Sequence, residues 1–463
     1  MAVEIVQLEG YLQNFTEFAK ETEHVTPLWL RELRAAAFAR FCAVGFPTTR
    51  QEDWRFTNVA ELARTPFRLA RPSAVPFTVS ELAQWRMTGA VARMVFIDGH
   101  FAPELSTWGA LPGDVTVNSL RKEIAHRPQM VAEHLGRYLD IERDPFCALN
   151  TAFAEDGAYV HVSRGAVVEQ PIHLLFVSTS HGAPAMTHPR NLIVVEDEGQ
   201  ASIVEDYVSF GAESAAFSNA VTELVAGGNA NVVHTMIERE HLQTCNVSTL
   251  RIEQNRSANV TSHSLLLGGA LVRNNVHPVL AGEGGECLIN GLFIGSGRQH
   301  LDNYMLVEHA SPRCASRQFY NGILDERAHG VFHGRIIVHK DAQKTDAKQT
   351  NRNLLLADDA QIDTKPQLEI YADDVKCTHG ATIGQIDETA LFYLRSRGIG
   401  EVEARGLLLQ AFAGECLDRM KPGAARDYAE TAIGQRLRPL AHAGAVERES
   451  TKDTRERNWE EAG

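Results

Sequence analysis

The chain has 463 residues, 44% of them apolar and 22% charged, a length at which single hydrophobic cores usually give way to two or three structural parts. Its net charge of −14, without any stripe of Lys and Arg, argues against nucleic acid as the main partner. No apolar run approaches the ~18 residues of a membrane-spanning helix, so we expect no membrane partner either.

Cysteine usage and the first residues bear on the cellular compartment. Seven cysteines are scattered without any Cys-x-x-Cys pair, which suits a reducing compartment better than a disulfide framework. The stretch from Met1 to Gly10 lacks the basic and then apolar pattern of a secretory signal. We therefore expect a cytoplasmic protein.

The first part of the chain, residues 1–140, is expected to be helical and mixed. Thr26-Pro27 can supply the cap and first position of a helix, whose apolar residues recur at helical spacing up to Phe41. Gly45 then ends this helix.

The rest of this part contains three further features. In a charged stretch, Trp54 and Phe56 are expected to anchor a loop on the body of the protein. The proline-flanked segment 72–76 is typical of a linker, and residues 95–99 indicate a strand followed by a turn.

Between Gln200 and Ser316, a small residue followed by a strand-like run returns about every 28 residues. These runs begin at Ala201, Ala230, Ala258 and Glu286, with a weaker echo at Cys314. A second series falls midway between them, at 217–225, 245–252, 271–280 and 300–307. Two strand-like runs per repeat at a fixed period are typical of a solenoid, in which each unit buries its apolar face against its neighbours.

The expected fold class is therefore mainly β: a right-handed parallel β-helix (solenoid) flanked by N-terminal and C-terminal helical parts. Further strand-like runs place this β-helix core at 150–384. Its turns, such as 226–229 and 282–285, are rich in Gly and Asn, which tolerate positive φ. The right hand is expected because parallel crossover connections prefer it.

After Gly384 the apolar residues change to a period of 3.6. Asp387 can cap a first helix, a pair of glycines interrupts it, and 402–412 can form a second helix. We assign 385–444 to a helical domain that covers the last turn of the solenoid or offers a docking surface. The tail at 445–463 is mostly charged and polar and is expected to be disordered.

The chain lacks the motifs of nucleotide-binding, zinc-protease and serine-hydrolase sites. The best local constellation is Cys377 and His379, near the end of the solenoid. On a strand these two side chains point to the same face, roughly 7 Å apart. A thiolate and an imidazole suit zinc, or iron with sulfide. Two ligands do not close a tetrahedral site, so the others must come from elsewhere, for example from another chain.

Structural roles compete with this interpretation. On composition alone, a buried Cys377 beside a satisfied histidine is the more frequent outcome. His329 and His333 form a second candidate pair. Their spacing is taken to give a shared face only on a helix, and the surrounding glycines argue against a helix, so structural histidines are favoured.

Acidic pairs indicate a different class of function. Glu205-Asp206 and Asp358-Asp359 are candidates for the carboxylates of a β-helix lyase or hydrolase acting on carbohydrates. Carboxylates at strand ends and turns are more often solvated. A carbohydrate-active enzyme is therefore kept as the alternative to a protein without catalytic machinery.

Several motifs resemble one protein family in combination. They are Phe332-His333-Gly334-Arg335-Ile336, Ala342-Gln343-Lys344-Thr345-Asp346-Ala347, Gln349, Asn351, Asn353-Leu354-Leu355-Leu356, Asp363-Thr364-Lys365-Pro366-Gln367-Leu368-Glu369-Ile370, the run from Asp373 to Gly384, and the run from Leu391 to Gly398. With the repeats and the stretch from Glu52 to Thr57, they are similar to the SufB/SufD family of iron–sulfur cluster assembly proteins over most of the chain. The N-terminal stretch is more like the SufD branch of that family than the SufB branch.

The resemblance implies a right-handed parallel β-helix that serves as a non-catalytic scaffold subunit in a complex with SufB and the ATPase SufC. In this family SufB and SufD pair through the ends of their β-helices. Each also docks one SufC on its C-terminal helices, which correspond here to 387–412. By similarity, ATP-driven pairing of the SufC subunits strains and opens the interface between SufB and SufD.

The resemblance also implies where a nascent cluster forms. Sulfur delivered to SufB and iron whose entry needs SufD meet at the interface of the two β-helices. Carried over, Cys377 and His379 lie there as metal ligands, with His379 favoured on the SufD side. The cofactor implied is an iron–sulfur cluster that is transient and shared with SufB, and none is tightly bound by the isolated chain. A homodimer of the isolated chain and a flavin bound to the complex are left open by the sequence.

Overall fold

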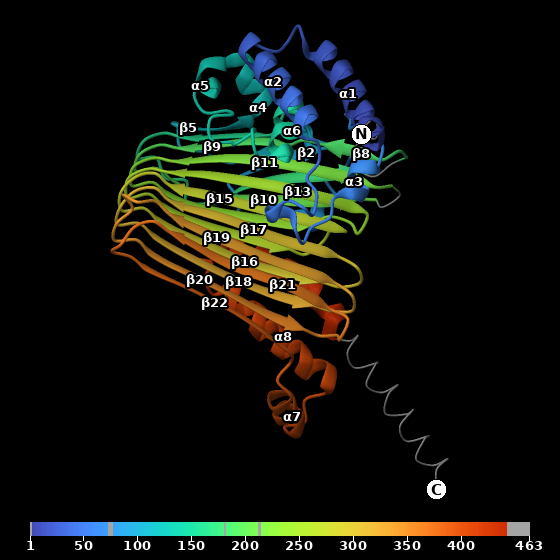
Figure 1. Cartoon of the computed structure of the whole chain (residues 1–463), viewed down its shortest axis with the longest axis vertical. Helices are drawn as coiled ribbons and strands as arrows, with labels where there is room; N and C mark the ends of the chain where they lie inside the picture. Colours follow the sequence, from blue (N-terminus) through green and yellow to red (C-terminus); the bar gives the residue numbers. More distant parts are fainter. Residues whose placement is uncertain (1, 73–76, 180–181, 212–213, 442–463) are drawn as a thin grey trace.

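The computed structural model describes residues 2–72, 77–179, 182–211 and 214–441, with side chains from residue 8 onward. Long strands stacked one above the other form a parallel β-solenoid, with helices at its two ends (Figure 1). The predicted fold class, mainly β with a parallel solenoid between helical parts, is confirmed. The predicted disordered tail at 445–463 and positions 73–76 of the predicted linker lie outside the described residues.

The solenoid consists of two sheets of 11 strands each, which we call sheet A and sheet B. Sheet A contains β1 (Arg68–Leu69), β5 (Val115–Ser119), β6 (Ala158–Val162), β8 (Ala185–Thr187), β9 (Arg190–Val195), β11 (Ala216–Ala226), β13 (Thr244–Gln254), β15 (Leu271–Leu280), β17 (His300–His309), β19 (His329–Val338) and β21 (Gln361–Ile370). Sheet B contains β2 (Ala92–Ile97), β3 (His100–Phe101), β4 (Thr107–Trp108), β7 (Ile172–Thr179), β10 (Gln200–Phe210), β12 (Asn231–Arg239), β14 (Asn259–Leu266), β16 (Glu286–Gly295), β18 (Ala315–Leu324), β20 (Asp346–Leu355) and β22 (Lys376–Gly384).

The predicted repeat matches the alternation of strands between the two sheets. The first series of strand-like runs becomes β10, β12, β14, β16 and β18 of sheet B, and the second becomes β11, β13, β15 and β17 of sheet A. Side-chain hydrogen bonds between neighbouring turns join residues 27 (Asn290 and His263), 28 (His234 and Ser262) and 31 (Gln349 and Gln318) positions apart. The sheets also begin earlier than predicted, because β2 and β5 precede residue 150.

One column of turns has a left-handed residue in seven successive coils of the solenoid, but not in the last one, before β22. Its members are Gly165, Glu198, Asn229, Ser257, Gly284, Arg313 and Lys344, all with positive φ. Only some of them are Gly or Asn, so the turn chemistry that we expected from composition holds in part. Gly282 serves a different purpose: a Cβ there would overlap the backbone of Asn255 and Arg256 in the preceding coil. This glycine allows close stacking of turns rather than a special φ.

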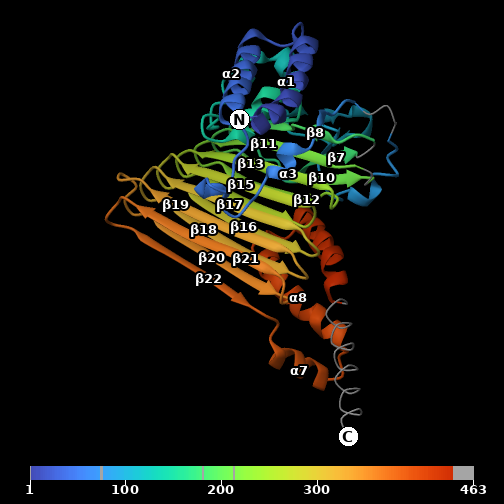
Figure 2. The same cartoon turned by 45° about the vertical axis from the view of Figure 1, so that its right-hand side comes forward.

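Helices from the first part of the chain cover one end of the solenoid and the adjoining outer face of sheet A (Figure 2). They are α1 (Ala2–Thr22), α2 (Leu28–Val44), α3 (Ala60–Arg64), α4 (Leu120–His126), α5 (Pro128–Ala132) and α6 (Pro145–Phe153). The predicted helix is α2, and the N–H of Gly45 (φ 66°) bonds the carbonyl of Phe41 at its end. The predicted anchor Trp54 is buried, and the guanidinium of Arg273 lies 3.9 Å from its ring.

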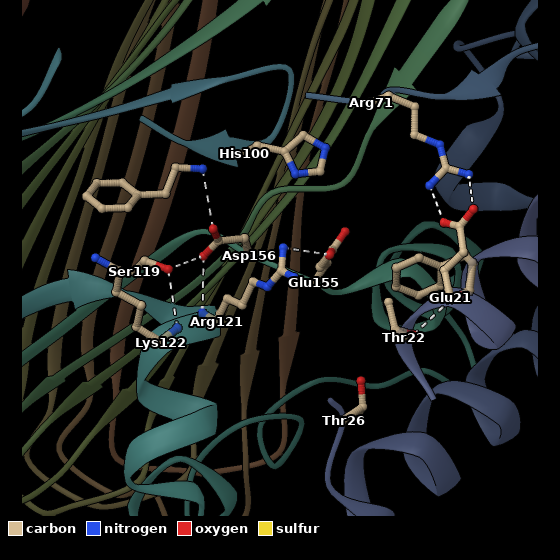
Figure 3. Close-up of polar contacts among 12 residues, drawn as sticks. Glu21, Thr22, Thr26, Arg71, His100, Ser119, Arg121, Lys122, Glu155 and Asp156 are labelled. Atoms are coloured by element: carbon tan, nitrogen blue, oxygen red, sulfur yellow. Dashed lines mark hydrogen bonds and ion pairs between the residues drawn. The ribbon is translucent and has the colours of Figure 1, made fainter. Parts of the chain in front are cut away.

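A buried carboxylate ties this cap to the first strands of the solenoid (Figure 3). Asp156 accepts hydrogen bonds from the hydroxyl of Ser119 at 2.7 Å and from the backbone N–H groups of Arg121, Gly157 and Phe101. Ser119 in turn caps α4. Burial raises the pKa of Asp156, although these hydrogen bonds oppose the shift. The start of α4, the loop before β6 and β3 are thereby held at one point.

Three C-terminal helices follow β22. They are α7 (Glu388–Ser396), α8 (Glu401–Leu417) and a helix at 424–441, of which only the first two were predicted. Asp387 caps α7 through the N–H groups of Thr389 and Ala390, as expected. Helix α8 and the helix at 424–441 pack Leu409, Ala413 and other apolar residues against the outer face of sheet B. Among the helices of the described residues, none is long and apolar enough to cross a membrane.

Candidate functional site at the open end of the solenoid

At the end of the solenoid remote from the N-terminal helices, no further strand of the described residues pairs with the last strand edges. In sheet A, β21 pairs only with β19, and in sheet B, β22 pairs only with β20, within the described part of the chain. Most residues of β22 are exposed, whereas the strands below are largely buried. An edge strand of this kind leaves a row of backbone N–H and C=O groups that can pair with a further strand. Figure 1 shows β22 as the last strand of the stack.

Both candidate ligands of the sequence lie on this last strand. Residues 376–384 form a strand, so Cys377 and His379 share a face. Cys377 is in register with Ala347, which is 1% exposed, and packs against the core between the two sheets. The shared face is therefore the inner one. Cys377 is half-buried and His379 is exposed, so both lie where a partner at this end would meet them.

The donor set fits iron with sulfide but is incomplete. A thiolate and an imidazole are both ligands of iron–sulfur chemistry. Partial burial raises the pKa of the Cys377 thiol, which favours its protonated form. Within the described residues, no group of three or more His, Cys, Asp or Glu side chains could hold a metal ion. Cys377 and His379 are thus two possible donors on the last strand, and no third one lies with them in the described residues.

The coil beneath the two ligands has polar side chains on its inner face. Gln349 of β20 is in register with His379 and is 1% exposed. Its Nε2 donates a hydrogen bond to Oε1 of Gln318, one coil further down, at 2.8 Å. Sequence reasoning gave Gln349 no role of its own. The sequence contained one indication of its position: Gln349 precedes His379 by about one coil. In the parallel register, residues one coil apart are neighbours on adjacent strands.

His329 and His333 lie on β19 of sheet A, where both rings have partners. Nε2 of His329 lies 2.8 Å from Oδ2 of Asp363, and Nε2 of His333 lies 2.7 Å from Oε1 of Gln367. Our statement that residues four apart share a face only on a helix was wrong, because a strand also returns to the same face at every second residue. Because both rings have hydrogen-bond partners within the chain, these histidines fit the structural role that the sequence favoured.

The acidic pairs do not form the site of a carbohydrate-active enzyme. We expected Glu205 and Asp206 to be solvated at a strand end. Instead both are buried inside β10. Glu205 faces the core and contacts His234, whereas Asp206 faces outward and pairs with Arg239. Two carboxylates on opposite faces of one strand cannot flank a single glycosidic bond. Asp358 and Asp359 lie in an exposed turn between β20 and β21.

A second exposed feature lies on the C-terminal helices, close to the same end of the solenoid (Figure 2). Phe392 and Tyr393 on α7 are 74% and 57% exposed, and Leu407 on α8 is 42% exposed. On α8, Leu409 is fully buried against sheet B, whereas Leu407 faces outward. These three side chains are exposed apolar groups on the first two helices that follow β22.

Comparisons with known proteins indicate the family of this chain. A family model described as the SufBD core domain of SUF system FeS cluster assembly matches residues 176–412, and a model of the SufBD protein N-terminal region matches residues 6–174. A SufBD family iron–sulfur cluster assembly protein of Synechocystis is 37% identical over 382 residues, which cover 81% of this chain and 84% of that protein.

Two similar bacterial proteins have the name SufD. The iron–sulfur cluster assembly protein SufD of Escherichia coli is 32% identical over 396 residues, covering 85% of this chain and 90% of that protein. SufD of Bacillus subtilis is 25% identical over 416 residues, covering 87% and 92%. The chain belongs to the SufB/SufD family of iron–sulfur cluster assembly proteins, as both family models and these relatives show, and its parallel solenoid is consistent with that family.

Proposed function

We propose that this chain is a non-catalytic scaffold subunit that pairs end to end with a sister solenoid chain, SufB, and docks the ATPase SufC on its C-terminal helices. The cluster under assembly is the cargo of this complex and is held at the seam between the two solenoids. The observation that carries the proposal is the uncovered last coil, with Cys377 and His379 on its inner face.

The open edges give a physical reason for end-to-end pairing. The strand edges of β21 and β22 offer backbone donors and acceptors to another chain, and a partner that extends both sheets would satisfy them. The apolar inner face of the last coil supports the same pairing. Ile362 and Leu368 on β21 are only partly buried, although they pack against the core. A sister coil stacked on top would complete their burial, as each coil does for the one below it.

The incomplete donor set gives a reason for placing the cargo at the seam. Cys377 and His379 provide two donors, and a sister chain has to provide the others. A site divided between two chains can be assembled and opened by moving the chains relative to each other. A site inside one rigid solenoid has no such freedom, since close-packed cores deform little.

The exposed residues of α7 and α8 support the docking of an ATPase. Phe392, Tyr393 and Leu407 provide apolar contacts on a helix pair that is joined directly to β22. A force applied to α7 is therefore transmitted to the last strand of the solenoid. This connection links nucleotide-driven movement of a docked ATPase to the seam where the cargo lies.

Co-expression tests the proposal directly. The tagged chain is produced together with a SufB and a SufC, purified without oxygen, and analysed for partners, iron and sulfide. We expect all three chains to co-purify, and His379→Ala to lower the cluster content at least tenfold with the complex intact. His24→Ala, at an exposed histidine of the opposite end, is the matched control. Purification of the tagged chain alone, or an unchanged cluster content in His379→Ala, contradicts the proposal.

A further inference from the structure

We propose that Gln349 is a positioning residue for His379. In the proposed arrangement its side-chain Oε1, which has no hydrogen-bond partner in the described structure, accepts the N–H of one ring nitrogen of His379, so that the other nitrogen is left unprotonated and available to a metal ion. This inference rests on the proposed function, because it concerns how the ligand His379 is prepared.

The register of the last two strands of sheet B brings the two side chains together. Gln349 on β20 and His379 on β22 are directly paired in a parallel ladder. Neighbouring strands lie about 4.8 Å apart, so in-register side chains on one face are within contact of each other. Both face the core side, as the burial of Gln349 and the core contact of Cys377 indicate. No other strand lies between them.

Among the described residues, the Gln349 amide has one hydrogen bond, to Gln318, and its other end is free. Nε2 donates to Oε1 of Gln318 at 2.8 Å, so the amino end of the Gln349 amide is directed to the coil below. Oε1 of Gln349 is buried and has no hydrogen-bond partner in the described structure. Buried acceptors are nearly always satisfied in folded proteins. A donor is therefore expected at this oxygen, and the imidazole of His379 is the in-register side chain with an N–H to offer.

The opposite sheet leaves room for this arrangement. Gly334 of β19 faces the amide of Gln349 across the interior, and a Cβ at that position would overlap its Nε2 and Cδ atoms. Any larger residue at 334 would push the Gln349 side chain away from its place. The glycine thus leaves room for the amide that bonds Gln318 in the coil below.

The chemistry explains why such a neighbour matters. A neutral imidazole protonates one of its two nitrogens, and the hydrogen bond made by one nitrogen determines which one binds metal. Metal-binding histidines almost always donate their other N–H to a carbonyl, carboxylate or water, and loss of that partner lowers metal affinity 10- to 100-fold. Gln349 offers such a carbonyl from a buried, rigid strand. It touches neither cargo nor partner and acts only through His379.

The first test needs no metal and uses the chain by itself. The ring-nitrogen chemical shifts of His379 are measured by NMR on protein labelled with ¹⁵N-histidine, and the signals that vanish in His379→Ala identify them. We expect a single tautomer in the natural chain and in Gln349→Glu, whose carboxylate can also accept the hydrogen bond. Gln349→Leu should give the mixed tautomers of a free imidazole. Identical His379 signals in the natural chain and in Gln349→Leu would overturn the proposal.

The second test measures the consequence in the co-expressed complex. Gln349→Leu and Gly334→Ala, which displaces the amide without altering it, should each lower cluster content or iron affinity about 10- to 100-fold, whereas Gln349→Glu should restore it. Thermal unfolding of each variant shows whether the solenoid is intact. If His379→Ala abolishes the cluster but a folded Gln349→Leu retains it, the positioning role fails and the proposed function stands. If His379→Ala has no effect, the proposed function itself fails.

Discussion

The guanidinium of Arg239 forms two parallel hydrogen bonds with the carboxylate of Asp206, Nε to Oδ1 at 3.0 Å and Nη2 to Oδ2 at 2.6 Å. Asp206 is fully buried on β10, and Arg239 ends the neighbouring strand β12. The hydroxyl of Tyr428, from the helix at 424–441, donates to the same carboxylate oxygen at 2.6 Å. This pair therefore joins the outer face of sheet B to the last described helix.

Asp206→Ala should lower the free energy of unfolding by about 3–5 kcal/mol, because it leaves Arg239, whose side chain is only 15% exposed, without its counter-ion. Chemical denaturation followed by circular dichroism measures the loss. Asp359→Ala is the control, since Asp359 forms an exposed ion pair with Arg327 at 3.3 Å and such pairs contribute less than about 1 kcal/mol. Equal losses of unfolding free energy in the two variants would show that the Asp206–Arg239 pair stabilises the protein no more than an exposed pair does.

The stability of the protein should decrease as the pH falls below about 6.5, the ordinary pKa of histidine. Burial lowers the pKa of His188 and His277 to about 3, and that of His263, His300 and His309 to about 4. A group with a lowered folded pKa binds its proton more readily when unfolded, so its contribution is complete above pH 6.5 and is lost on acidification.

His188→Gln tests this account, because glutamine cannot titrate and its carbonyl can still accept the hydrogen bond from Asn219. The slope of unfolding free energy against pH between 4 and 6 should decrease by up to about 1.4 kcal/mol per pH unit. His24→Gln, at an exposed position, should leave the slope as it is. A His188→Gln slope identical to that of the natural chain would contradict the assignment.

Gly291→Ala should destabilise the solenoid by about 1–3 kcal/mol through overpacking. A Cβ on Gly291 of β16 would overlap the ring of Tyr320, which lies on β18 in the next coil and is fully buried. Gly414→Ala is the matched control on helix α8, where nothing lies within 4 Å of an added Cβ, and it should stabilise the helix by up to about 1 kcal/mol. Thermal melts compare the two, and a stabilising Gly291→Ala would refute the close stacking.

Alkylation should reveal whether the open end is covered in the complex. Cys42 and Cys377 are both half-buried, with thiol pKa values raised by burial, and they lie near opposite ends of the solenoid. In the isolated chain, both should react slowly with a maleimide. In the co-purified complex, Cys377 should be protected at least tenfold while Cys42 reacts at its former rate, as mass spectrometry of the peptides can measure. Unprotected Cys377 in an intact complex would argue against pairing at this end.

Substitutions at Leu409 and Phe392 distinguish the stability of the C-terminal helices from their role in docking. Leu409→Ala removes a fully buried side chain of α8 and should cost about 2–5 kcal/mol of stability. Phe392→Ala removes a side chain that is 74% exposed, so it should leave the melting temperature unchanged and weaken capture of the ATPase. Calorimetry and a pull-down of the co-expressed chains read out both effects. Normal ATPase capture by Phe392→Ala would exclude this residue from the docking surface.

Local patterns in the sequence were sufficient for the solenoid and for several element ends. A solenoid coil buries its apolar face against the next coil, so the strand repeat between Gln200 and Ser316 appears directly in the residues. The ends at Gly45 and Asp387 were also predictable, because a left-handed glycine and a capping carboxylate act on adjacent backbone groups. The sequence also indicated that Cys377 and His379 share a face if their segment is a strand, and it is one.

Only the tertiary structure decided which residues one coil apart meet, and which faces are covered. A period of about 28 residues does not specify the register that sets Gln349 beside His379 or Gly291 under Tyr320, because turn lengths differ from coil to coil. Nor do alternating residues reveal that Asp206 is buried under a helix from the other end of the chain. Burial depends on contacts distant in sequence, and so the chemical environment of each site residue was determined by the fold rather than by its neighbours in the chain.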